Sequence, residues 1–186
     1  ISLWNTGNVA TMGTAFWSAT AFNNDVSTWN TSGVTTMREL FEMAPYFNGD
    51  VSKWDTSKVT DMTEMFRGAV EFNGNISTWD TSKVVTMEYM FYQGQKFNAD
   101  ISKWDTSKVT DLGETFNEAA NFNGDVSKWD TSKVTNMYQM FFRASSFKML
   151  TSGAAGSMWL LDEMPLAHWD VARVSVAENM LAGSGM

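Results

Sequence analysis

The side chains most able to do chemistry in this chain are one histidine and a large set of carboxylates. His168 is the only histidine and there is no cysteine, so no second histidine or thiol can complete a zinc site or a catalytic triad. The carboxylates recur at a fixed spacing, as at Asp50, Asp100 and Asp125, whereas a catalytic pair would be singular. We therefore predict that the chain is not an enzyme, with no catalytic residue, metal site or cofactor.

Two sets of recurring polar residues could bind a ligand. Stacked Asp and Asn oxygens suit Ca²⁺, but the Gly/Asp nonapeptide of calcium-binding β-rolls is missing, so we expect no calcium. Threonine recurs in two columns, where a column is a set of residues spaced by 25 or a multiple of 25: Thr31, Thr56, Thr81, Thr106 and Thr131, and Thr35, Thr60, Thr110 and Thr135. Thr rows at strand spacing are the geometry by which ice-binding solenoids order water, but the same hydroxyls can satisfy turns and cap helices. Glycan or ice binding by these ordered columns is the alternative function.

Two further polar columns have an architectural interpretation. An Asn follows each recurring Phe, at Asn23, Asn48, Asn73, Asn98 and Asn123, and its amide can satisfy backbone groups of its own and the adjacent turn. The Asp column that includes Asp55 lies three residues before the Lys column that includes Lys58. We expect the two columns to form a solvated and mutually neutralised stripe.

All of these residues recur because the chain itself repeats. Tryptophan returns every 25 residues at Trp4, Trp29, Trp54, Trp79, Trp104 and Trp129, and whole segments return with it. Such a period is typical of stacked repeats, in which each unit buries its apolar face only against its neighbours. We expect one domain over residues 1–186 with about seven repeats, whose Phe, Trp, Val and Met side chains form internal ladders.

Each repeat contains two candidate elements. Met62, Met65, Phe66 and Ala69 have the i, i+3, i+4, i+7 spacing of one helix face, and a polar residue precedes them as a cap. The segment 51–54 is β-branched and aromatic and follows an Asn-Gly-Asp turn, which predicts a short strand. The predicted fold is an α/β solenoid, a right-handed, leucine-rich-repeat-like coil of 25-residue units, each a short parallel strand plus a short helix.

Composition excludes some partners. The formal net charge of −8 disfavours nucleic acid and anionic membranes, which attract basic patches. No apolar run reaches the roughly 18 residues of a membrane span. Because Ile1 enters in mid-repeat, we expect further repeats or a neighbouring subunit to cover the ends.

The unit FNGDVSKWDTSKVTDM, followed by MF and a small residue, resembles the BspA-like surface-protein repeat, also called the mycoplasma lipoprotein-associated type. The resemblance covers residues 1 to about 147 and a degenerate last copy, and it implies a leucine-rich-repeat-like fold. It also implies surface or secreted placement, and interaction or adhesion instead of catalysis. An organelle lumen is the other compartment that we consider.

The period breaks once, before the last repeat. Trp169 follows Trp129 by 40 residues, so an insertion lies at 148–165. Its apolar cluster either caps the last turn or exposes a patch for a protein partner. The partner-binding candidates are Met158, Trp159, Leu160, Leu161 and His168. We predict a noncatalytic protein-interaction scaffold, either a surface module or a peripheral subunit of a larger assembly.

Overall fold

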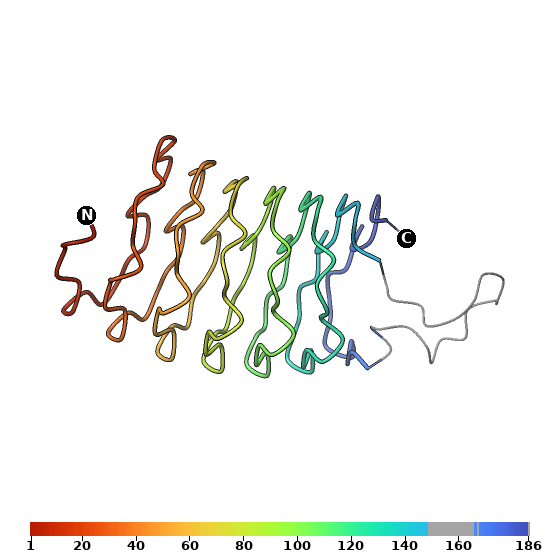
Figure 1. Ribbon diagram of the computed structural model, residues 1–186. Helices are drawn as coiled ribbons and strands as arrows, with labels where there is room; N and C mark the ends of the chain where they lie inside the picture. The colour runs from red at the N-terminus through yellow and green to blue at the C-terminus, as the bar shows by residue number, and fades with distance from the viewer. Residues whose placement is uncertain (149–165, 167, 186) are drawn as a thin grey trace.

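The computed structural model describes residues 1–148, 166 and 168–185. The chain winds into a row of turns that lie side by side from the N-terminus to the C-terminus (Figure 1). Single parallel β-bridges join consecutive turns at one residue each: Thr11, Thr36, Asp61, Thr86, Asp111, Asn136 and Val176. The first six of these residues are 25 apart, so each repeat makes one full turn of the stack.

The predicted α/β, leucine-rich-repeat-like solenoid is wrong. In the part of the chain that the structure describes there is no helix, and the only β-structure is the isolated bridges. The expected strand at 51–54 is a tight turn, in which the Trp54 N–H donates to the Val51 carbonyl at 3.1 Å. Each turn of the stack is therefore built from linked reverse turns instead of a strand and a helix.

The segment predicted as a helix, 62–69, is a ribbon of overlapping β-turns. The N–H groups of Met65, Arg67 and Ala69 donate to carbonyls three residues earlier. The N–H groups between them leave the segment, as when Glu64 donates to the Glu88 carbonyl of the next turn at 2.9 Å. Glu64 has φ 58° and Gly68 has φ +67°, values that fit the third position of type II turns and not a right-handed helix.

Close stacking explains why the ribbon forms instead of a helix. The Phe66 and Phe91 rings of adjacent turns lie 5.8 Å apart, whereas a helix with its side chains is about 10 Å across. A helix in every turn would hold these rings too far apart. The ribbon keeps the same inward face, because Met62, Met65 and Phe66 are all buried, and also bonds half of its N–H groups to the next turn.

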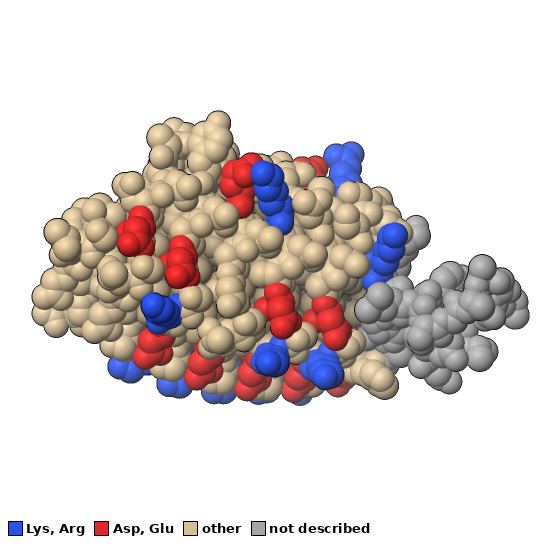
Figure 2. Space-filling view, viewed as in Figure 1, with Lys and Arg blue, Asp and Glu red and all other residues tan. Residues whose placement is uncertain are grey.

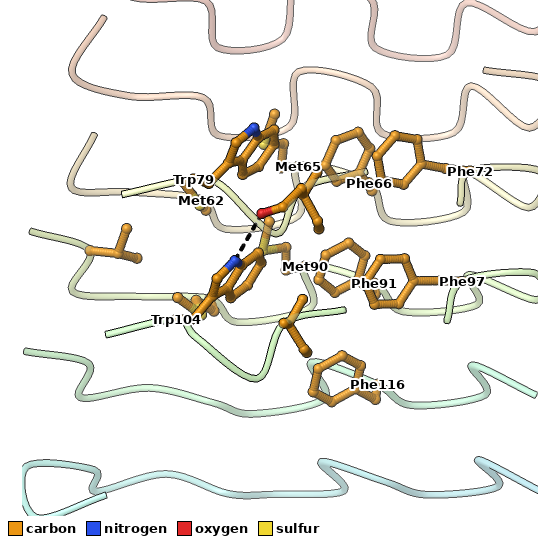
Figure 3. Close-up of a cluster of buried hydrophobic side chains, with 14 of the residues drawn as sticks. Met62, Met65, Phe66, Phe72, Trp79, Met90, Phe91, Phe97, Trp104 and Phe116 are labelled. Carbon is orange, nitrogen blue, oxygen red and sulfur yellow. Dashed lines mark hydrogen bonds between the residues drawn. The ribbon is translucent and has the colours of Figure 1, made fainter. Parts of the chain in front are cut away.

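The predicted internal ladders are confirmed. Trp54, Trp79 and Trp104 stack with ring centroids 6.4–6.5 Å apart and planes within 3° of parallel. Beside them, Phe66 packs on Phe72 at 3.8 Å, and the same pair recurs in the next turns (Figure 3). Each indole also ties two turns together, as the Trp104 Nε1–H donates to the Ile76 carbonyl at 3.1 Å (Figure 3).

Candidate interaction surface

The first threonine column lies inside the molecule. Thr56 is 1% exposed, and its hydroxyl donates to the Asp80 carbonyl of the next turn at 3.0 Å. Thr81, Thr106 and Thr131 repeat this arrangement. A buried hydroxyl cannot contact ice or a glycan, so this column gives the alternative function no support.

The second threonine column is mostly exposed but is neither continuous nor free. The Thr60 hydroxyl donates to the Thr35 carbonyl of the preceding turn at 3.3 Å. Val85, which is 41% exposed, replaces threonine in the middle of the column. The column therefore forms one interrupted row of hydroxyls instead of a broad flat face.

The asparagine column connects turns, as its architectural interpretation predicted. The Asn48 Oδ1 accepts the Asn73 N–H of the next turn at 2.9 Å, and Asn73 does the same for Asn98 at 2.8 Å. Gly74, which follows Asn73, has its Cα beside the Phe72 ring, where an added Cβ would come within 3.0 Å of that ring. The column is thus part of the framework of the stack.

The aspartate columns close turns within each repeat. The Asp55 Oδ1 accepts the Ser57 N–H at 3.0 Å, and hydrogen bonds from Ser57 lower the pKa of this carboxyl, as do the nearby lysines. Among the residues that the structure describes, the Asp55 and Lys58 columns form no ion pair within 4.0 Å, so their neutralisation is long-range. Figure 2 shows alternating acidic and basic side chains in a regular row along one long edge of the molecule.

The described ranges also contain no group of three or more His, Cys, Asp or Glu that could hold a metal ion.

Of the predicted partner-binding residues, only His168 falls in the described part. It is exposed, while the adjacent Trp169 is buried and its Nε1–H donates to the Val126 carbonyl at 3.1 Å. Met158, Trp159, Leu160 and Leu161 lie outside the described residues. Whether they form a cap or an interface therefore stays a prediction.

A comparison of the turns shows a surface that the sequence analysis missed. We name each column by its member in the turn 51–75. The columns from Val51 to Val59 hold nearly the same residue in every turn and are called the constant columns, whereas four columns of the ribbon change from turn to turn. We call these the Thr63, Glu64, Arg67 and Gly68 columns, and together the variable face. The Arg67 column, for example, reads Trp17, Glu42, Arg67, Tyr92, Asn117, Phe142 and Ala182.

The residues of the variable face contact one another across turns. The Arg67 Nη1 lies 2.6 Å from Glu42 Oε1 and 3.0 Å from Glu64 Oε2. The same guanidinium lies 5.8 Å from the Tyr89 ring centre and 5.4 Å from that of Tyr92. One cation is thus held between two carboxylates and two phenol rings, an arrangement that combines ion pairing with cation–π attraction.

Burial changes the titration of several groups near Arg67. Glu42 is 6% exposed, and burial together with the Glu64 charge raises its pKa in spite of the Arg67 cation. Burial also raises the pKa of Tyr89 and Tyr92, and nearby carboxylates add to the effect. Both phenols are therefore neutral hydrogen-bonding groups at physiological pH.

A second cluster continues the variable face two turns later. The Glu118 carboxylate accepts from Gln93 Nε2 at 3.0 Å and from Arg143 Nη1 at 3.3 Å. The Arg143 guanidinium lies 4.9 Å from the centre of the Phe142 ring. The combination of Arg with aromatic rings recurs here with different residues, as expected for a surface whose composition is not fixed by the stack.

The fold and this surface define a repeat protein with a uniform interior and one variable face. A family model described as "Mycoplasma protein of unknown function, DUF285" matches residues 1–91 and 71–158. The chain belongs to this family. No curated protein and no solved structure matches the chain. No helix in the described ranges is long and apolar enough to cross a membrane.

Proposed function

We propose that this chain is a noncatalytic protein-interaction scaffold, either a surface or adhesion-type module or a peripheral subunit of a larger assembly. The observation that supports this most is the separation of constant and variable columns on one stack. Stacking and turn formation determine most of the constant columns, because side chains such as Trp54 and Thr56 pack inside and the Asp55 carboxylate bonds to the backbone. Glu42, Thr63 and Asn117 of the variable columns are buried, whereas their other large side chains lie outside the core and are available for recognition.

The composition of the variable face fits a protein partner. Half-buried Tyr89, Tyr92, Tyr138 and Phe142 lie among arginine and carboxylate side chains. Tyrosine and arginine are enriched at protein interfaces and dominate their binding energy. In the described part of the chain, the constant columns expose a single aromatic side chain, Trp4 of the first turn.

Placement is part of the same proposal. Membership of the mycoplasma repeat family is consistent with the finer resemblance to BspA-like repeats, which implies the cell surface or secretion. An organelle lumen is the other compartment proposed. Further repeats or a neighbouring subunit would cover the ends, where Leu3 and Trp4 are exposed.

The test compares two paired variants in affinity capture from the native cell or its surroundings. Tyr89→Ser with Tyr92→Ser alters the variable face, and Lys83→Ser with Lys108→Ser alters the constant columns. We expect the first pair to lose the captured proteins and the second to retain them, with both folded by tryptophan fluorescence. Equal capture by the two pairs would overturn the proposal.

The insertion has its own test. Polar replacements of Met158, Trp159, Leu160 and Leu161 are expected to weaken partner association and leave the repeats folded. Unchanged association would remove these residues from the interface, and unfolding of the repeats would show that they cap the last turn.

A further inference from the structure

The charges of the variable face are unbalanced. Eight glutamates lie in the four variable columns and the adjoining Glu71 column: Glu39, Glu42, Glu64, Glu71, Glu88, Glu114, Glu118 and Glu178. The same columns hold four cations, Arg38, Arg67, Lys96 and Arg143, and each of them already pairs with a glutamate. Seven of the lysines lie instead on the constant columns that include Lys53 and Lys58. The variable face is therefore complementary to a cationic partner.

Among the half-buried glutamates of this face, Glu88 has the least compensation of its charge. Within the described ranges, its carboxylate takes part in no ion pair and accepts no hydrogen bond, although the side chain is half-buried. The charged groups that act on Glu88 are three carboxylates, those of Asp111, Glu64 and Glu114, and one cation, Arg38. Burial and these carboxylates raise the pKa of Glu88. A cation brought by a partner would offset both effects.

Aromatic residues lie next to Glu88 in the chain and further along its column. Tyr89 is its neighbour in the chain, and the Tyr89 and Tyr92 rings meet edge to face at 5.8 Å. Tyr138 occupies the same column as Glu88 two turns later, with Gly113 between them. These rings supply the apolar contact area that a charged group alone lacks.

The protein already holds a cation of its own in this way. Arg67 pairs with Glu42 and Glu64, and its guanidinium faces the Tyr89 and Tyr92 rings. Tyr89 and Tyr92 belong to the turn of Glu88, and Glu114 belongs to the next turn. A second cation at Glu88 would find the same kinds of group, carboxylates and phenol rings, on the following turns.

We propose that the partner docks a segment carrying arginine or lysine on the variable face, with a cationic side chain paired to Glu88 beside Tyr89, Tyr92 and Tyr138. This inference rests on the proposed function and names the chemistry of the partner. Arginine suits the site better than lysine, since its planar group can pair with a carboxylate and stack on a ring together. Protonation of Glu88 would weaken the pairing, so affinity rises as the pH increases through the range just above the ordinary glutamate value.

The experiment measures binding of an alternating Arg-Gly peptide to the full chain, with a Gln-Gly peptide as the neutral match. Glu88→Gln is expected to lower affinity about tenfold and to flatten its pH dependence. Glu178→Gln makes the same charge change in the same column of the last turn and is expected to alter affinity less than about twofold. Tyr92→Ser should weaken binding, whereas Tyr92→Phe should retain it.

Equal losses from Glu88→Gln, Glu178→Gln and the constant-column change Asp80→Asn would show that binding only follows net charge, and would overturn the inference. Absence of Arg-Gly binding would also overturn it. If the Tyr89 and Tyr92 replacements abolish capture of the native partner while Glu88→Gln has no effect, the variable face is the interface but the partner is not basic. If variants of the constant columns lose the native partner and variants of the variable face retain it, the proposed function itself is overturned.

Discussion

The constant columns and the variable face occupy the same turns but are held to the neighbouring turns in different ways. Val59, Trp54 and Thr56 are buried in every middle turn, and each has its counterparts directly above and below. A few residues later in the chain, the ribbon bonds to the next turn through its backbone, as from Glu64 to Glu88. Backbone bonding does not depend on side-chain identity. The outward side chains of the ribbon can therefore change while the stack stays the same.

This difference explains why the variable face tolerates unusual residues. Positive φ recurs at the Glu64 and Gly68 columns in every turn, yet glycine occupies only Gly68 and Gly183 of these positions. A left-handed conformation costs a non-glycine residue about 1–2 kcal/mol. Tyr89, Glu118 and Arg143 of the variable face occupy such positions.

The largest effect that separates the two regions is expected from an aromatic truncation. Phe91 is fully buried and packs on Phe97 at 3.7 Å, whereas Tyr92 beside it is half-buried on the variable face. Phe91→Ala should lower the free energy of unfolding by about 3–5 kcal/mol because it leaves a cavity in the stack. Tyr92→Ala should cost below about 1 kcal/mol in chemical denaturation. Similar losses for the two variants would contradict the division into core and free surface.

A smaller effect distinguishes the two threonine columns. The buried Thr81 hydroxyl donates to the Asp105 carbonyl at 3.0 Å, so Thr81→Val should cost about 1–2 kcal/mol by leaving that carbonyl without its donor. Thr60→Val is the matched control, because Val85 already occupies that column. Its expected cost in the same denaturation experiment is below about 0.5 kcal/mol. The reverse order would mean that the exposed column, and not the buried one, joins the turns.

The smallest effect is expected in the pH dependence of folding stability. Hydrogen bonds from Ser102 lower the pKa of Asp100, so the native state gains stability above the unfolded pKa and loses it as the pH falls through the lower, folded value. Asp100→Asn should reduce the loss of stability below about pH 4, because the amide oxygen keeps the turn but does not titrate. Asn75 occupies the equivalent place in the preceding turn. An unchanged pH profile would show that this carboxylate is not linked to folding.

Part of this molecule could be predicted from its sequence. The period, the aromatic ladders and the role of Asn48 and its counterparts were evident, because identical residues at a fixed spacing must stack. The ribbon was mistaken for a helix because Met62, Met65 and Phe66 have a spacing that overlapping turns share with a helix face. The hydrogen bonds between turns and the positive φ angles of Glu64 and Gly68 distinguish the two structures.

The variable face was missed for a different reason. A search for repeated residues finds those of the framework, such as Trp54 and Asp55. The columns that indicate a binding surface are those whose residue differs from turn to turn. Alignment of the turns alone would have shown that the Arg67 column changes at every step. What the alignment could not show is that Arg67 contacts Glu42 of the preceding turn and both Tyr89 and Tyr92 of the next turn.

The central claim is that the ribbon side chains are independent of the stack that carries them. It is tested most directly by exchanging, in one variant, the residues that two neighbouring turns hold in the Glu64 column and in the Gly68 column. The changes are Glu114→Gln with Gln139→Glu, and Glu118→Arg with Arg143→Glu. The exchange keeps composition, net charge and the 118–143 ion pair. We predict a free energy of unfolding within about 1 kcal/mol of the original chain. A loss as large as that of Phe91→Ala would contradict the account.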